Sequence, residues 1–199
     1  MIDDPRLAPL GRFTSEGALT PGYGDAYLFL GGRDDVQGVL KTVLGQETLQ
    51  IKLSMVDYDD ELGDIVLAKM YDTRVHVQIT LDRSRATEVN ERKILDLDRR
   101  SSPAGFANSV VVNDYSAIHF PHTQVGLLGG QGIAFEIGLK GADGGEGRGV
   151  NLNGPSPRRL KTQPDTLLVS SNSVLMSRLS ARMDVEHHAA ARSGRPAAA

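Results

Sequence analysis

"TLQIKLSMVDYDDELGDIVLAKMYDTRVHVQITLDRS", residues 48–84, contains three hydrophobic patterns in succession. The first and the last alternate apolar with polar residues, as strands do. The middle one has apolar residues three and four positions apart, which is typical of an amphipathic helix. The apolar residues are, in order, Leu49, Ile51 and Leu53; Leu62, Ile65, Val66 and Met70; and Val75, Val77, Ile79 and Leu81. The segment is therefore a predicted strand–helix–strand unit.

Elements of the same two kinds flank this unit. Residues 34–44 have helical spacing with Asp34 as the expected N-cap. A further helix is predicted after Ser171, Asn172 or Ser173, with Leu175, Leu179 and Met183 on one face. The other predictions are a helix over 86–100 and strands over 25–30, 106–112, 165–170 and, around a tight Gly129–Gly130 turn, within 122–138. Strands that alternate with helices predict an α/β (α+β) sandwich, with a mixed, largely parallel β-sheet flanked by helices.

The length of 199 residues predicts one domain. We expect an irregular N-terminal arm over residues 1–24, a single domain over 25–190 and a disordered tail over 191–199. Within the domain, residues 138–164 are rich in Gly, Pro, Asn and Arg and predict a long loop.

Composition narrows the classes of function. The chain has no cysteine, which excludes disulfides, thiol catalysis and zinc sites with sulfur ligands. It shows neither a signal peptide nor an apolar run of about 20 residues, so we expect a cytoplasmic protein without a membrane span. Residues 148–199 carry a formal charge of +5 and residues 1–147 a charge of −8. The basic part is either a solvated loop and tail or a segment that helps to hold an anionic ligand.

The segment "AIHFPHTQVGLLGGQGIAFEIGLK", residues 117–140, carries the candidate chemistry. Because side chains alternate across a strand, His122 and Gln124 are expected on one face. With Glu136 of the next strand they can form a polar cluster. The alternative is that His122 only begins a strand and Gln124 is an ordinary hydrogen-bonded residue. His119 precedes the strand and has no assigned role.

The order of elements from about residue 26 to 188, with a histidine on a late strand, resembles one repeat of the phospholipase D-like superfamily of phosphodiesterases. That family has the motif His-any-Lys, four residues, Asp, followed by Gly-Ser-any-Asn. The resemblance implies that the histidine attacks phosphorus and that the lysine neutralises phosphate oxygens. A chain with one motif resembles the short nuclease-like members, which complete their site as homodimers.

Carried over residue by residue, the motif is incomplete. His122 takes the nucleophile position and Thr123 the free position, whereas Gln124 stands at the lysine position and Gly129 at the aspartate position. The Gly-Ser-any-Asn segment falls on residues 137–140 without both the serine and the asparagine. The cations that can replace the lysine charge are Lys140, Arg148, Arg158, Arg159 and Lys161.

Three hypotheses follow. The first is a catalytically impaired phospholipase D-like domain that serves as a homodimeric binding or structural module. The second is a working phosphodiesterase or nuclease that uses a phosphohistidine on His122 and the basic loop. The third is nucleic-acid binding without cleavage, which the overall acidity disfavours. We expect a phosphate-containing ligand and neither a metal nor a cofactor. His76 is predicted to be solvated or hydrogen-bonded on the polar face of its strand, and His187 and His188 are predicted to lie near a frayed helix end.

Overall fold

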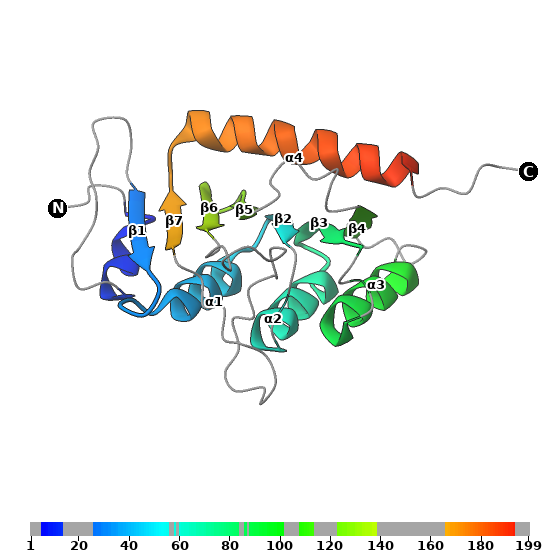
Figure 1. Cartoon of the computed structure of the whole chain (residues 1–199), viewed down its shortest axis with the longest axis horizontal. Coiled ribbons are helices and arrows are strands. Elements are labelled where there is room, and N and C mark those ends of the chain that lie inside the picture. Colours follow the sequence, from blue (N-terminus) through cyan, green and yellow to red (C-terminus); the bar gives the residue numbers. More distant parts are fainter. Residues whose placement is uncertain are drawn as a thin grey trace, which may run out of the picture.

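The structure is a computed structural model, and it describes residues 5–13, 26–55, 58, 60–83, 86, 88–101, 108–113, 123–138 and 166–193. These residues form a seven-stranded sheet with helices on both faces (Figure 1). The strands are β1 (Ala26–Leu30), β2 (Gln50–Met55), β3 (His76–Asp82), β4 (Asn108–Asn113), β5 (Thr123–Leu128), β6 (Ile133–Gly138) and β7 (Thr166–Ser170). The helices are the 3-10 helix η1 (Ala8–Phe13), α1 (Val36–Gln46), α2 (Asp60–Tyr71), α3 (Val89–Ser101) and α4 (Ser173–Ser193).

The strand order among the described residues is β1-β7-β6-β5-β2-β3-β4. The pairs β2–β3 and β3–β4 are parallel, and the other four pairs are antiparallel. The α/β fold and the mixed sheet are thus confirmed, but the expectation of a largely parallel sheet needs correction. The short turn between β5 and β6 permits only antiparallel neighbours, whereas α2 and α3 connect parallel ones.

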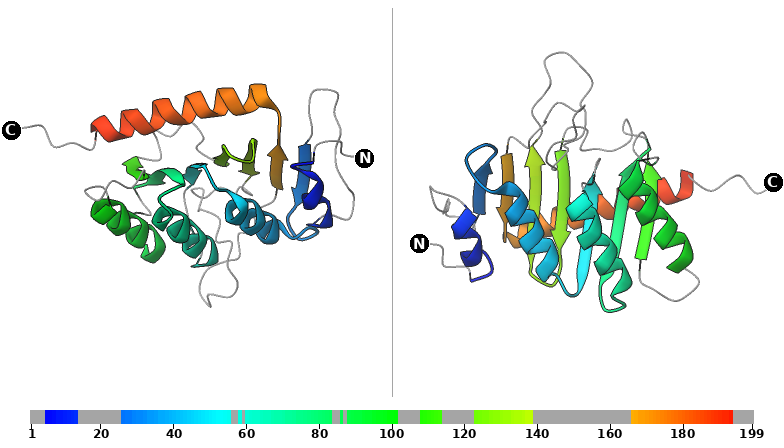
Figure 2. Two further views of the ribbon diagram at one scale, coloured as in Figure 1. Left: turned by 180° about the vertical axis from the view of Figure 1, so that it is seen from behind. Right: turned by 90° about the horizontal axis from the view of Figure 1, so that it is seen from below.

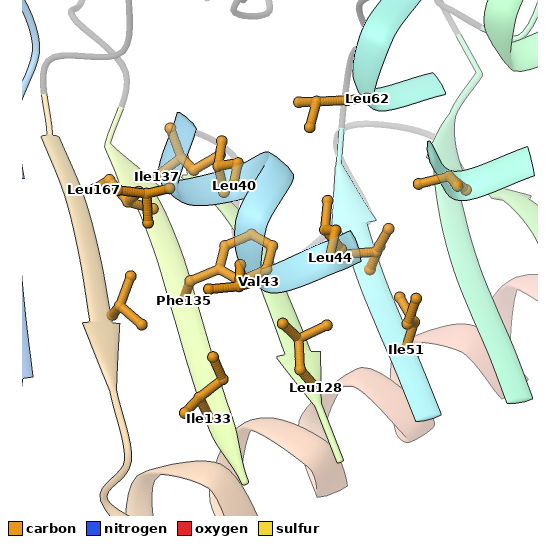
Figure 3. Packing of buried hydrophobic residues seen from close by; sticks show 14 of the residues in the cluster. Leu40, Val43, Leu44, Ile51, Leu62, Leu128, Ile133, Phe135, Ile137 and Leu167 are labelled. Carbon is orange, nitrogen blue, oxygen red and sulfur yellow. The ribbon is translucent and has the colours of Figure 1, made fainter. Parts of the chain in front are cut away.

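The two faces of the sheet are covered differently. Helices α1, α2 and α3 lie side by side on one face, and α4 alone crosses the other (Figures 1 and 2). The main apolar core lies between the sheet and α1 to α3. Figure 3 shows Leu40 and Val43 of α1 packed against Phe135 and Ile137 of β6. All four side chains are buried, as their predicted periodicity requires.

The N-terminal cap of α1 differs from the sequence prediction, whereas that of α4 is one of the predicted residues. Asp35, not Asp34, caps α1 by accepting a hydrogen bond from the Gly38 N–H at 2.9 Å. Asp34 instead accepts one from the Leu30 N–H at 2.7 Å. Asn172, one of the three predicted caps of α4, accepts hydrogen bonds from the Val174 and Leu175 N–H groups, both at 3.0 Å. Both caps satisfy N–H groups that the first helical turn leaves free.

Two described segments lie at the predicted domain limits. Leu7 and Leu10, in and beside η1, are buried in the main core. Residues 5–13 of the predicted arm therefore pack against the domain. At the other end, α4 continues to Ser193 rather than ending at residue 188. No helix in the described ranges is long and apolar enough to cross a bilayer.

Candidate functional site

The structure describes only part of the predicted site. Gln124, Gly129 and Glu136 lie in or beside the β5–β6 hairpin. His122 directly precedes Thr123, the first residue of β5, and is outside the described residues. The other predicted residues outside them are His119, Lys140, Arg148, Arg158, Arg159 and Lys161. Their roles stay predictions.

Gln124 occupies an apolar position of β5. It pairs with Ile137 of β6 in the antiparallel register. Paired residues of such a ladder point to the same face, which here is the face covered by α1. The Gln124 side chain is fully buried, and neither its Oε1 nor its Nε2 has a hydrogen-bond partner among the described residues. Gln124 thus contributes a neutral, buried amide at this position.

Glu136 lies on the opposite face of the sheet from Gln124. It pairs with Val125, and its side chain is exposed. The two side chains therefore cannot meet, and the predicted grouping of Gln124 with Glu136 is wrong. The pairing places Gln124 with Ile137, so Glu136, one position earlier, faces away from it.

Gly129 begins the turn between β5 and β6. Its N–H donates to the Gln50 carbonyl at 2.8 Å. Within this turn the positive φ, 64°, is at Gly132 rather than at the Gly129–Gly130 pair. The turn lies at the end of β5 remote from Thr123. Gly129 and Gln124 are therefore at opposite ends of the strand.

A buried carboxylate fixes this turn. Glu47, between α1 and β2, is fully buried. Its carboxylate accepts hydrogen bonds from the N–H groups of Leu49 at 2.7 Å, Thr48 at 2.9 Å, Gly130 at 3.0 Å, Gln131 at 3.1 Å and Gln50 at 3.2 Å. Burial alone would raise the pKa of Glu47, but these backbone hydrogen bonds lower it below its usual value. Glu47 therefore has a structural role.

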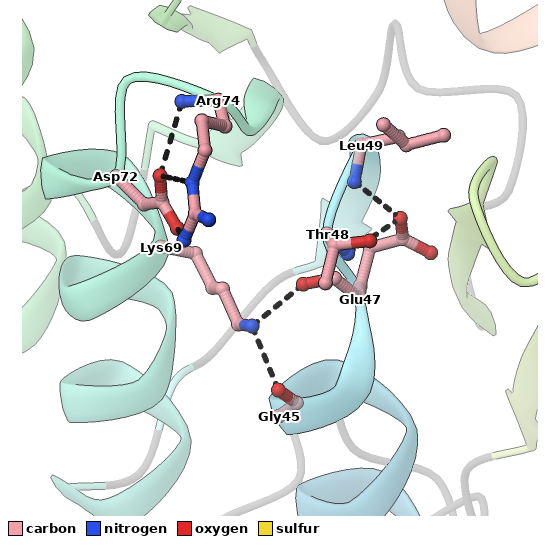
Figure 4. A network of polar contacts seen from close by, with 7 residues as sticks. All are labelled: Gly45, Glu47, Thr48, Leu49, Lys69, Asp72 and Arg74. Atoms are coloured by element: carbon pink, nitrogen blue, oxygen red, sulfur yellow. Dashed lines mark hydrogen bonds and ion pairs between the residues drawn. The ribbon is translucent and has the colours of Figure 1, made fainter.

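Lys69 of α2 completes this support. Its Nζ donates to the carbonyls of Glu47 at 2.6 Å and Gly45 at 2.7 Å, as Figure 4 shows. The same figure shows Arg74 bonded to Asp72, and these hydrogen bonds lower the pKa of Asp72 to about 2. The two hydrogen bonds of Lys69 tie α2 to the end of α1. They hold the Lys69 ammonium group away from the end of β5 at which Gln124 lies.

The end of β5 at which Gln124 lies is also where helices α1, α2 and α3 begin. Helices α1 and α2 each follow a strand that ends at this edge of the sheet. Their first turns carry the exposed carboxylates Asp35, Asp60 and Glu61. These negative groups suit the positive ends of the helix dipoles. Arg33 after β1 and Arg83 after β3 lie at the same edge, and Lys41 pairs with Glu61, so the described part of this edge carries charges of both signs.

A second polar cluster, which the sequence did not predict, lies between the sheet and α4. Lys52 of β2 donates to Ser180 Oγ at 2.9 Å and to Asp184 Oδ1 at 2.7 Å. Gln78 of β3 also donates to Asp184 Oδ1, at 3.1 Å. Burial would raise the pKa of Asp184, but the hydrogen bonds from Lys52 and Gln78 lower it.

His187 forms the other half of this cluster. Its Nε2 lies 2.7 Å from Ser109 Oγ on β4, and its Nδ1 lies 3.2 Å from Thr80 Oγ1 on β3. Burial, together with the charge of His188, lowers the pKa of His187 to about 4. The imidazole is therefore neutral near pH 7, and the expected frayed position is wrong because α4 buries this side chain on the sheet. The seven residues are called the α4 cluster below: Lys52, Gln78, Thr80, Ser109, Ser180, Asp184 and His187.

One sequence signal could have found the α4 cluster. Lys52, Gln78 and Thr80 take the polar positions of predicted strands. His187 follows Met183 by four positions and precedes Ala190 by three, which is the spacing of one helix face. Met183 and Ala190 are both buried. A helix extended beyond residue 188 would have placed His187 on the inner face.

Comparisons with known proteins support the fold. No family model matches the sequence, and a search of curated proteins finds no match. The structure is similar to that of TrmBL2, described as an archaeal chromatin protein with a novel mode of DNA binding, with a TM-score of 0.55 and 12% identity. This match covers 92% of the chain but only 57% of TrmBL2.

The structure is also similar to Nuc from Salmonella typhimurium, a phospholipase D family member, with a TM-score of 0.51 and 13% identity. This match covers 81% of the chain and 93% of Nuc. At such low identities the likeness concerns the fold. The chain therefore has a phospholipase D-like α/β fold.

Proposed function

We propose that the chain is a catalytically impaired phospholipase D-like domain that serves as a homodimeric binding or structural module. The observation that carries the proposal is the state of Gln124. A histidine nucleophile that attacks a phosphodiester needs fixed cations and donors aimed at the phosphate oxygens. Gln124 has no charge, and its amide is buried on the apolar face of β5.

The other departures from the motif support the same conclusion. Loss of one preorganised donor typically lowers a rate by about 10² to 10³. The missing lysine and aspartate of the motif are both expected to lower the rate of phosphodiester hydrolysis.

The homodimer belongs to the proposal through the resemblance to the short nuclease-like members. The chain has one candidate motif histidine, His122, and each of those short members likewise carries one motif. Such a dimer brings together two copies of the edge at which β5 begins. Sedimentation velocity over a range of concentrations measures the oligomeric state, and a chain that stays monomeric at all of them contradicts this part.

Cleavage assays test the impairment. We expect negligible hydrolysis of bis(p-nitrophenyl) phosphate, DNA and RNA, and no difference between the unmodified chain and His122→Ala. His119→Ala is the matched control, since it removes a neighbouring histidine without a proposed role. Hydrolysis that His122→Ala abolishes and His119→Ala retains would establish the alternative, an active phosphodiesterase. In that case Arg158→Ala with Arg159→Ala is expected to lower turnover.

Nucleic-acid binding without cleavage is a second candidate, favoured by the similarity to TrmBL2 and by the +5 formal charge of residues 148–199. Fluorescence anisotropy with a labelled duplex at several salt concentrations tests it. Neutralised phosphates release counterions, so binding by this segment must weaken steeply as salt rises. Binding that is absent at low salt rejects this candidate and leaves a structural module or another ligand.

A further inference from the structure

The two faces of the sheet hold their helices by different forces. The main core lies on the side of α1 to α3. On the other side, the α4 cluster supplies five of the described hydrogen-bonded pairs between α4 and the sheet, which are Lys52–Ser180, Lys52–Asp184, Gln78–Asp184, Thr80–His187 and Ser109–His187. Apolar contact from the second half of α4 comes from Met183 and Ala190. Polar interactions therefore contribute a large share of the docking of α4.

His187 suits this interface only as a neutral ring. A neutral imidazole has one N–H donor and one acceptor nitrogen, and a hydroxyl can serve as partner to either. Thr80 and Ser109 provide one hydroxyl for each ring nitrogen. Protonation keeps both hydrogen bonds feasible but places a positive charge where the side chain is 3% exposed. A buried charge is unfavourable unless a carboxylate neutralises it.

The nearby charges do not provide that neutralisation. Lys52 on β2 is a cation, and Asp184 on α4 is the carboxylate that it contacts. Since Asp184 accepts hydrogen bonds from Lys52 and Gln78, it cannot fully neutralise a second cation. His188, the next residue on α4, adds positive charge when it is protonated and further disfavours protonation of His187.

Other ionisable residues share this face of the sheet. On β3, His76 and Asp82 share the face of Gln78; His76 is exposed, and the Asp82 side chain is outside the described ones. On β6, Glu136 is exposed. Strand β4 has no ionisable residue. On α4, Arg182 donates to Glu186 at 3.1 Å. An increase in positive charge at His187 therefore meets no uncommitted carboxylate in direct contact among the described residues.

We propose that His187, held between Thr80 and Ser109, is an acid-sensitive latch, and that its protonation releases the C-terminal half of α4 from the sheet. In the docked helix the ring has a pKa of about 4, against 6.5 for a free histidine. The docking contribution is thus complete above pH 6.5 and is lost as the pH falls from 6.5 towards 4. The docking equilibrium weakens by up to roughly 300-fold across this range.

Release exposes a polar surface that α4 otherwise covers. Thr80 is buried and Ser109 half-buried beneath the helix, and β4 is an edge strand of the described sheet. The apolar core on the other face is unaffected because its residues contact α1 to α3. The latch therefore predicts a local opening that precedes global unfolding.

The absence of cysteine allows a direct test on the full chain. The variant Ala190→Cys places a thiol on the buried face of the released half. Its reactivity is measured with dithiodipyridine, which reacts with thiols at acidic pH. Ala189→Cys lies on the exposed face and gives a reference labelling rate at each pH. Dividing the rate of Ala190→Cys by this reference removes the pH dependence of the reagent itself. Val39→Cys, in the main core, reports global unfolding.

We expect the corrected labelling rate of Ala190→Cys to rise by one to two orders of magnitude between pH 7 and pH 5, as linkage requires. Val39→Cys should stay protected over the same range. Adding His187→Gln, which cannot be protonated, should remove this pH dependence. Adding Asp184→Asn should enlarge the rise in labelling between pH 7 and pH 4, because Asp184 is the carboxylate that favours the protonated ring in the docked helix.

Three results would overturn the latch. One is an Ala190→Cys thiol that stays protected at every pH at which Val39→Cys is protected. Another is an unchanged pH dependence in the His187→Gln background. If His187→Gln undocks the helix at all pH values, Asp184→Asn decides, and a rise in labelling between pH 7 and pH 4 that is no larger than without this change rejects the proposal.

Discussion

Lys52 on β2 and Asp184 on α4 form an ion pair across the interface between the sheet and α4, with Lys52 Nζ 2.7 Å from Asp184 Oδ1. The two residues are 132 positions apart in the chain. The lysine side chain is 8% exposed and the aspartate side chain 39% exposed. The pair is therefore partly shielded from solvent, and its removal is expected to be measurable.

We expect Lys52→Met to lower the free energy of unfolding by about 1–3 kcal/mol, since it leaves Asp184 without its cation. Urea denaturation followed by circular dichroism measures the change. Asp184→Asn and the double variant complete a cycle, in which a positive coupling energy is the expected result. Strict additivity of the two single changes would show that the pair does not contribute to stability.

Gln124→Met is expected to stabilise the protein by about 1–2 kcal/mol. It removes two buried polar atoms that have no partner among the described residues, and it keeps a similar side-chain volume. The midpoint of urea denaturation should rise. A fall in stability would mean that the amide is satisfied in solution.

Gln124→Lys is the counterpart of this variant. A lysine at the same buried position must bury a charge or deprotonate, so we expect a loss of about 2–4 kcal/mol. The same denaturation experiment measures it. A Gln124→Lys variant as stable as the unmodified chain would mean that this position reaches solvent, and would weaken the case for impaired catalysis.

Glu47→Gln is expected to destabilise the protein by about 1–3 kcal/mol near pH 7, because an amide NH₂ cannot accept the backbone hydrogen bonds that the carboxylate receives. The pKa of Glu47 is lowered from 4.5 in the folded state. Its contribution is therefore present above pH 4.5 and lost as the pH falls through the folded-state value. The gap in stability between the two proteins should narrow under acid. A gap that is constant down to pH 3 contradicts the assignment.

Gly126→Ala is expected to be destabilising by about 2–4 kcal/mol. A Cβ atom on Gly126 would overlap the ring of Phe135, which lies over this glycine in the neighbouring strand. Thermal denaturation measures the change. The second variant Phe135→Leu in the Gly126→Ala background should recover part of the loss, and a loss that stays the same would place the strain elsewhere.

Much of the secondary structure could be predicted from the sequence. The buried positions of β3, namely Val77, Ile79 and Leu81, match the predicted alternation, as do the buried residues of α1. The first half of α4 does not follow the prediction, because Leu175 is exposed whereas Met183 is buried. Helical spacing indicates which residues share a face, but it does not indicate how far along the helix the sheet extends.

The candidate site was less predictable. The sequence indicated that Gln124 takes the lysine position of the motif, yet Gln124 and Glu136 are on opposite faces because the register pairs Gln124 with Ile137. A shift of one residue in the register would have placed them together. The α4 cluster was not predicted, since it joins residues from β2, β3, β4 and α4 whose proximity depends on strand order.

The sequence by itself therefore determined most of the elements and the α/β class. These features depend on residue identity and on periodicity within a single segment. Only the tertiary structure decided that Gln124 is buried without a polar partner among the described residues and that Lys52, Asp184 and His187 meet beneath α4. Burial and pairing between distant segments follow from the packing of the whole chain, in which each contact depends on the register of elements far apart in the sequence.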